Sequence, residues 1–182
     1  MYVSRRPRKS QQTRDRIIAA VRDLLAEGSF HESTVEEVAS RAGVSRATLY
    51  QHFGTRLGLV DAMCESFDEN PALIALRETD DVDDFIAKVV DFWASEEKVL
   101  VQLYGAAAVD PAASDLVARQ RRDRQSELRR LLRGLEIDDR SAFAALSVLT
   151  SFETFQELRR HAGLPLREVT RTIQEAASRI LS

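Results

Sequence analysis

Several features that whole classes of protein require are scarce in this sequence of 182 residues. Cys64 is the only cysteine, so an intrachain disulfide cannot form, and a reducing, cytoplasmic location is expected. Apolar runs extend over only a few residues, whereas a membrane helix needs roughly 20. The early arginines are not followed by an apolar segment, so the N-terminus does not resemble a secretory signal. These absences predict a protein that makes no contact with a membrane.

Patterns that carry enzyme chemistry are also missing. Histidine occurs only at positions 31, 52 and 161, and this spacing does not suit a metal site. The sequence has no glycine-rich phosphate loop and no visible pairing of a nucleophile with a base. We therefore expect no catalytic residue, no bound metal and no cofactor, and the protein is predicted not to be an enzyme.

Charge is distributed unevenly along the chain, although the net charge is only −3. Residues 1–56 hold ten Lys or Arg and six Asp or Glu, whereas residues 57–182 hold sixteen basic and twenty-three acidic residues. This asymmetry favours a first third that faces a polyanion such as nucleic acid. A disordered basic tail on an ordinary domain would give the same asymmetry. The basic arm at residues 5–9 could enter a minor groove, but nonspecific attraction is the simpler expectation.

Four helices are expected in the first third of the chain, because apolar residues there recur at helical spacing. The first helix ends near Gly28, and the second begins after Thr34, which forms a capping box with Glu37. Gly43 stands where a helix needs a left-handed residue to end. Ser45 is placed to cap the third helix, which is short, and a fourth helix follows.

The rest of the chain is also predicted to be helical, since seven glycines and four prolines leave few turns for a β-rich fold. Asn70 and Pro71 interrupt the pattern, and residues 80–84 form an acidic, turn-like stretch. The expected helical segments, with Asp138 as cap of the fifth, are residues 56–67, 85–93, 99–104, 111–134, 139–161 and 165–181. The prediction is an all-α fold of about nine helices, with a three-helix head before a helical C-terminal domain.

Residues 34–53, with the sequence TVEEVASRAGVSRATLYQHF, carry the most specific motif. Two short helices joined by a glycine-containing turn are the geometry of a helix-turn-helix. The predicted inner side consists of Val35, Val38, Ala39, Val44, Leu49 and Phe53. The side chains left free to reach a groove of DNA are Ser45, Arg46, Ala47, Thr48, Tyr50 and His52.

The pattern EVAxxAGVSxxTLYxHF over residues 37–53 resembles the signature of TetR-type (tetracycline-repressor-like) transcription regulators. It covers only the first third of the chain. The resemblance implies a homodimer with two N-terminal DNA-binding heads and a variable C-terminal domain that binds a ligand. It therefore predicts a DNA-binding domain with a basic arm at residues 1–54, and an effector-binding and dimerisation domain at residues 55–182.

The resemblance also implies roles for individual residues. Arg46 and Ala47 stand where the family touches base edges, and an arginine fork suits guanine. Thr34 stands at the cap of the second helix, and Ser45 stands at the start of the recognition helix. The positions where the family contacts phosphates are Thr48, Tyr50 and His52. Arg56 replaces the lysine that the family usually has at the start of the fourth helix, so the charge is kept. Arg46 could instead be an ordinary solvated arginine, and Tyr50 and His52 could be packing residues.

The C-terminal part carries two weaker predictions. Candidates for the ligand pocket are Met63, Trp93, Tyr104, Phe152 and Phe155, although for any single one of them a place in the plain hydrophobic core is expected more often. The last two helices carry apolar stripes that include Leu146, Ile173 and Ile180, and the resemblance implies that they form a dimer bundle. An arginine-rich run over residues 119–133 could seat an anionic effector, but a solvated helix face with internal ion pairs is expected more often.

Three hypotheses for the function follow. The first is a ligand-responsive repressor that binds a palindromic double-stranded DNA operator as a homodimer, with an unknown small molecule as effector. The second is a DNA-binding dimer that has no effector. The third is an all-α enzyme that merely contains a helix-turn-helix-like segment, and the missing catalytic patterns count against it.

Overall fold

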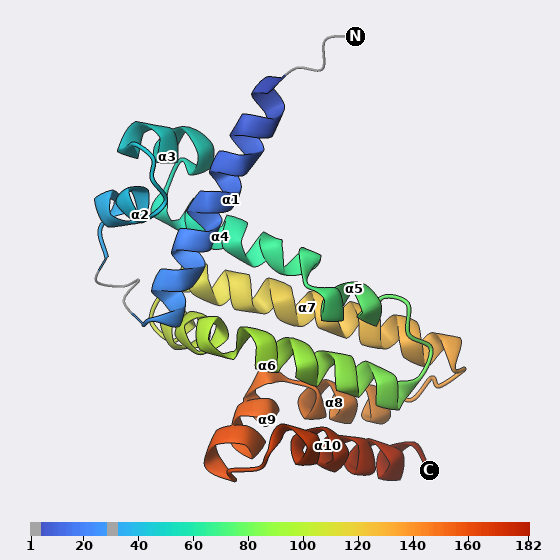
Figure 1. The fold of residues 1–182 in the computed structure, drawn as a ribbon. Helices are drawn as coiled ribbons and strands as arrows, with labels where there is room; N and C mark the ends of the chain where they lie inside the picture. The colour runs from blue at the N-terminus through green and yellow to red at the C-terminus, as the bar shows by residue number, and fades with distance from the viewer. Residues whose placement is uncertain (1–4, 29–32) are drawn as a thin grey trace. The chain divides into compact units, whose positions relative to one another are not determined.

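The computed structural model describes residues 5–28 and 33–182, and these residues form ten α-helices and no strand (Figure 1). The all-α prediction is confirmed. The helices are α1 (Arg5–Ala26), α2 (Val35–Arg41), α3 (Arg46–Phe53), α4 (Arg56–Glu65), α5 (Pro71–Leu76), α6 (Val82–Ala107), α7 (Pro111–Gly134), α8 (Arg140–Leu149), α9 (Phe152–Gln156) and α10 (Leu166–Leu181). Among these described helices, none is both long and apolar enough to cross a membrane.

The chain divides into two compact units. The first comprises residues 1–68 and 98–116, and the second comprises residues 69–97 and 117–182. Each of the long helices α6 and α7 therefore has one segment in the first unit and another segment in the second. The domain boundary expected after residue 54 separates a DNA-binding part from an effector-binding part. The division into compact units does not test these binding roles, so the boundary stays a prediction.

The core of the first unit forms where α1 packs on α2 and α4. Apolar side chains spaced three and four residues apart on α1, among them Ile17, Val21 and Leu24, are almost fully buried. The basic residues 5–9, which were expected to form an arm, are the first turns of α1. The helix stops before Gly28, whose φ of +76° is the left-handed conformation that glycine adopts without steric cost.

Three expected boundaries differ from the structure. The fourth helix ends at Glu65, and a 3₁₀ turn occupies Ser66–Glu69. Asn70 and Pro71 begin helix α5, because the Asn70 carboxamide oxygen accepts a hydrogen bond from the backbone N–H of Ala72 at 3.0 Å. The two apolar segments expected around residues 85–93 and 99–104 belong to the single helix α6.

The single helix expected over residues 139–161 was wrong, because the chain breaks after α8. The Trp93 indole N–H donates to the backbone carbonyl of Thr150 at 3.1 Å. The guanidinium of Arg124, which is buried on α7, donates to the Thr150 hydroxyl at 2.6 Å and to the Ser147 carbonyl at 3.0 Å. Ser151 then caps α9, and a π-helical turn follows at Glu157–His161. Trp93 and Arg124 therefore donate to carbonyl groups that, in a continuous helix, would accept hydrogen bonds from backbone N–H groups of the same helix.

The cap of α8 is Asp139, one residue later than expected. Its carboxylate accepts hydrogen bonds from the backbone N–H groups of Ser141 at 2.7 Å and Ala142 at 3.2 Å. A short helix N-terminus of this kind needs an acceptor for its unpaired N–H groups, and either aspartate could have supplied one.

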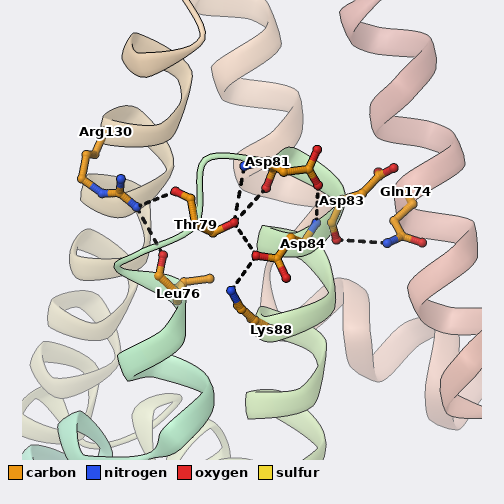
Figure 2. A network of polar contacts seen from close by, with 8 residues as sticks. All are labelled: Leu76, Thr79, Asp81, Asp83, Asp84, Lys88, Arg130 and Gln174. Carbon is orange, nitrogen blue, oxygen red and sulfur yellow. Dashed lines mark hydrogen bonds and ion pairs between the residues drawn. The ribbon is translucent and has the colours of Figure 1, made fainter.

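A polar network fixes the loop between α5 and α6 in the second unit (Figure 2). The Arg130 guanidinium on α7 donates to the backbone carbonyls of Leu76 and Thr79, both at 3.2 Å. The buried Thr79 hydroxyl donates to the Asp84 carboxylate at 2.5 Å, and Lys88 pairs with the same carboxylate. Hydrogen bonds from Lys88 and Thr79 lower the pKa of Asp84. The loop carbonyls and hydroxyl are therefore satisfied without water.

Candidate nucleic-acid interface

The turn between α2 and α3 is built from local hydrogen bonds. The Thr34 hydroxyl accepts from the Glu37 N–H at 3.1 Å and caps α2. Gly43 ends that helix with a φ of +64°, and the N–H of Val44 reaches back to the Ala39 carbonyl at 2.9 Å. This six-to-one hydrogen bond is the Schellman ending of a helix, which needs the left-handed residue that glycine supplies here.

The start of α3 is set by Ser45. Its hydroxyl accepts the Thr48 N–H at 3.1 Å and lies 2.8 Å from the Thr48 hydroxyl. The backbone of Ser45 is extended, with φ −79° and ψ 154°, so the helical phase begins at Arg46. This phase decides which side chains of α3 point inward.

Among the residues assigned to the two sides of the motif, only predicted inner ones are buried and only predicted outer ones are exposed. Leu49 on α3 is fully buried, as are Val38 and Ala39 on α2. The other predicted inner residues, Val35, Val44 and Phe53, are only partly buried. Of the six residues predicted to reach DNA, Thr48 and His52 are partly exposed, and the exposed ones are Ser45, Arg46, Ala47 and Tyr50.

Arg46 is held by two neighbours on the exposed surface. Its guanidinium donates to the carboxylate of Glu36 on α2 and lies 5.4 Å from the centroid of the Tyr50 ring. The pKa of Arg46 is raised mainly by a hydrogen bond with the Tyr50 hydroxyl and, to a lesser extent, by the negative charge of Glu36. These two contacts restrict the orientation of the guanidinium. The contact of Glu36 could not be predicted from the sequence, because its partner lies ten residues away on another helix.

Arg56, the counterpart of the family lysine, is half-buried. It donates to the Ser33 carbonyl at 2.5 Å, so the start of α4 is tied to the segment before α2. Burial of the guanidinium lowers its pKa. This contact shows a structural role for Arg56, while its predicted phosphate contact stays a prediction, as do the DNA contacts of the other interface residues.

Two further arginines attach the motif to α1. Arg14 lies with its guanidinium 5.0 Å from the centroid of the Phe53 ring and pairs with Glu65 on α4 at 3.2 Å. Arg41 at the end of α2 pairs with Glu27 at 2.7 Å, and this hydrogen bond raises its pKa. Exposed ion pairs of this kind are screened by solvent and add little to stability, so their main effect here is on the position of α2 and α3.

Gly58 is a second residue whose role the sequence did not reveal. A β-carbon at this position would lie 2.2 Å from the backbone carbonyl oxygen of Phe53, the last residue of α3. Only a residue without a side chain therefore allows the first turn of α4 to approach the end of α3 this closely. Gly58 sets the distance between the recognition helix and the helix that supports it.

The five pocket candidates fall into different units. Met63 and Tyr104 belong to the first unit, and Met63 is fully buried. Trp93, Phe152 and Phe155 lie together in the second unit, where the centroids of Trp93 and Phe152 are 5.5 Å apart and those of Phe152 and Phe155 are 6.0 Å apart.

Two polar residues in the second unit were not predicted. The side-chain amide of Gln120 on α7 and the hydroxyl of Ser147 on α8 are buried and have no hydrogen-bond partner among the described residues. Gln120 lies one helical turn before Arg124, which contacts the Ser147 carbonyl. Buried polar groups are nearly always satisfied, so these two stand out among the described residues of the second unit. A polar residue at a buried position has no sequence signal of its own.

The arginine-rich run on α7 is largely engaged within the second unit. Arg121 pairs with Glu153 at 2.7 Å, Arg130 pairs with Glu127 at 2.9 Å, and the guanidinium of Arg129 lies 4.3 Å from the centroid of the Phe143 ring. These contacts agree with the expectation of internal ion pairs.

Part of the sequence matches a known protein family. Residues 17–63 match the family model described as bacterial regulatory proteins, tetR family. Over 70 residues the chain is 33% identical to the HTH-type transcriptional regulator UidR of Escherichia coli (strain K12). This match covers 38% of the chain and only 35% of that relative.

Solved structures resemble almost the whole chain. Salmonella enterica GusR has a TM-score of 0.73 and 19% identity, and the match covers 93% of this chain and 95% of that one. A protein from Saccharomonospora viridis that was solved in complex with choline has a TM-score of 0.68 and 17% identity, covering 91% and 95% of the two chains. At these identities the likeness shows a shared fold.

Substitution of Gly58 by alanine is expected to disturb the recognition helix. The added β-carbon cannot share space with the Phe53 carbonyl, so the end of α3 must move. We expect a loss of about 1–3 kcal/mol in the free energy of unfolding, measured by urea denaturation, together with weaker DNA binding. The matched control is Gly105→Ala on α6, where the new β-carbon meets no atom within 4 Å. Equal stability of the two variants would contradict the close approach.

Proposed function

Because this chain belongs to the tetR family of bacterial regulatory proteins, we propose that it is a ligand-responsive repressor that binds a palindromic DNA operator as a homodimer. The observation that carries the proposal is the exposed polar face of α3, on a helix capped by Ser45 and supported from within by Leu49. A recognition helix reads base edges with residues near its N-terminus, which is where Arg46 and Ala47 lie.

The excess of basic residues in the first third supports the same proposal. Lys9, Arg16 and Arg46 are among the exposed or half-exposed cations of the first unit. Phosphate contacts by such residues release counterions and supply most of the affinity that does not depend on sequence. UidR, which is 33% identical to the chain over 70 residues, is named as a transcriptional regulator.

Homodimer formation is supported by the surface of α8 and α10, which pack against each other in the second unit. Much of the predicted apolar stripe, including Leu146 and Ile173, is buried within the subunit itself and is not available to a partner. In contrast, Val148 on α8 is 64% exposed and Ile180 on α10 is 37% exposed. These large apolar side chains on adjacent helices favour coverage by the same surface of a second copy. Two heads can then enter major grooves roughly 34–36 Å apart.

Effector binding is supported by the second unit. An aromatic cluster that includes Trp93 and Phe152 lies in the same unit as the unpartnered groups of Gln120 and Ser147. A few polar anchors among apolar walls are typical of small-molecule sites. The structurally similar Saccharomonospora viridis protein holds choline, which shows that this fold can take a small ligand. A ligand changes operator affinity only if it binds the two conformations with different strength.

Arg46→Ala is expected to weaken binding to the preferred operator by about 1–3 kcal/mol and to relax its base preference. The cause is loss of a side chain that reaches base edges from the first turn of α3. A mobility-shift titration at several salt concentrations measures both affinity and its salt dependence, which should be steep for the unsubstituted protein. Arg167→Ala, at an exposed position on α10, is the control and should bind normally. Unchanged affinity and preference of Arg46→Ala would show that Arg46 does not read bases.

A thermal-shift screen of small organic compounds tests the effector. A compound that binds the folded protein at 100 times its dissociation constant stabilises it by about 2.7 kcal/mol. We expect at least one compound to raise the melting temperature and to release operator DNA, with both effects reduced by Gln120→Leu. If no compound raises the melting temperature, a DNA-binding dimer without an effector becomes the better account.

A further inference from the structure

We propose that Glu36 and Arg46 act as one unit that reads a G·C base pair in the major groove, so that Glu36 determines specificity together with the arginine. The inference rests on the proposed DNA-binding function and names a residue for it that lies outside the recognition helix. It starts from the ion pair between the carboxylate on the first turn of α2 and the guanidinium on the first turn of α3.

The pair lies at the open surface of the motif. About 56% of the Glu36 side chain and 60% of the Arg46 side chain are exposed, so both still present polar atoms to the outside. Tyr50, one turn after Arg46, places its ring 5.4 Å from the guanidinium. The carboxylate on one side and the phenol on the other restrict the orientations of the guanidinium. A restrained donor group loses less conformational entropy when it binds a base.

The hydrogen-bonding pattern of the pair complements one base pair. In the major groove, guanine offers its N7 and O6 atoms as acceptors, and the paired cytosine offers an N4–H donor. Arginine has five N–H donors and a carboxylate has about four acceptor positions, so one shared hydrogen bond leaves both groups with unused capacity. Arg46 can therefore donate to guanine while Glu36 accepts from the cytosine paired with it.

The charge of Glu36 favours this role over a contact with the DNA backbone. A carboxylate beside phosphate groups is repelled, whereas the edge of cytosine carries a donor that needs an acceptor. Pairing with Arg46 cancels the charge of Glu36 at the surface that faces DNA. The competing possibility is that Glu36 only occupies Arg46 and must be displaced before any DNA binds. That arrangement would lower affinity for all sequences alike and would add nothing to base preference.

The two possibilities are separated by selecting bound fragments from random duplex DNA with the full chain. The proteins compared are the unsubstituted chain, Glu36→Gln, Arg46→Met, the double variant, and Glu37→Gln as the control on the same turn of α2. Glutamine keeps the size of the side chain and removes its charge. Melting temperatures of all variants check that they fold equally well.

The unsubstituted protein is expected to enrich a palindromic site with a G·C pair at one fixed position of each half-site. Glu36→Gln and Arg46→Met should each lose about tenfold in discrimination at that same position, and Glu37→Gln should keep it. Because the two residues act as a unit, the double variant should lose no more discrimination than the single ones.

Two outcomes would overturn the inference. In the first, Glu36→Gln binds all sequences more tightly and keeps the same preferred site, which identifies Glu36 as a competitor for Arg46. In the second, Glu36→Gln and Arg46→Met change preference at different positions, which shows that they do not read one pair. If the unsubstituted protein enriches no fragment at all, the DNA-binding proposal fails, and that result is distinct from both.

Discussion

The hydrogen bond between the Ser45 hydroxyl and the Thr48 N–H, 3.1 Å long, fixes where α3 begins, and most of the functional surface depends on it. A start one residue earlier or later would rotate α3 by about 100° and turn its polar face toward the core. The left-handed Gly43 brings the chain to this starting point, and the buried Leu49 holds the chosen face inward. Local backbone chemistry thus decides which side chains of α3 are exposed.

How far the sequence predicted the structure depends on the range of the interactions involved. The caps at Thr34 and Ser45 and the turn at Gly43 were predicted correctly, since each is encoded within a few residues. The break after α8 was not, because the groups that stabilise it come from Trp93 and Arg124 on two distant helices. Glu36 and Gly58 were missed for the same reason: their significance lies in a neighbouring helix.

Stability and recognition place different demands on the exposed charges. An ion pair as exposed as that of Glu36 and Arg46 adds little to folding, because solvent screens it. Its value lies in the geometry that it presents to a partner. The second unit shows the opposite case, because buried groups such as Arg124 and Thr79 have neighbours that satisfy them, while Gln120 and Ser147 do not. The unsatisfied groups lie in the unit for which effector binding is proposed.

The central claim is that the outer face of α3 lies against DNA, and protection of a single thiol tests it most directly. In a Cys64→Ser background, a cysteine replaces Ala47 in one variant and Ser178, an exposed residue of α10, in the other. The rate of alkylation by a maleimide is then measured with and without the selected duplex. We predict that DNA slows the reaction strongly for Ala47→Cys and leaves Ser178→Cys unchanged. Equal rates for Ala47→Cys with and without bound DNA would contradict the account.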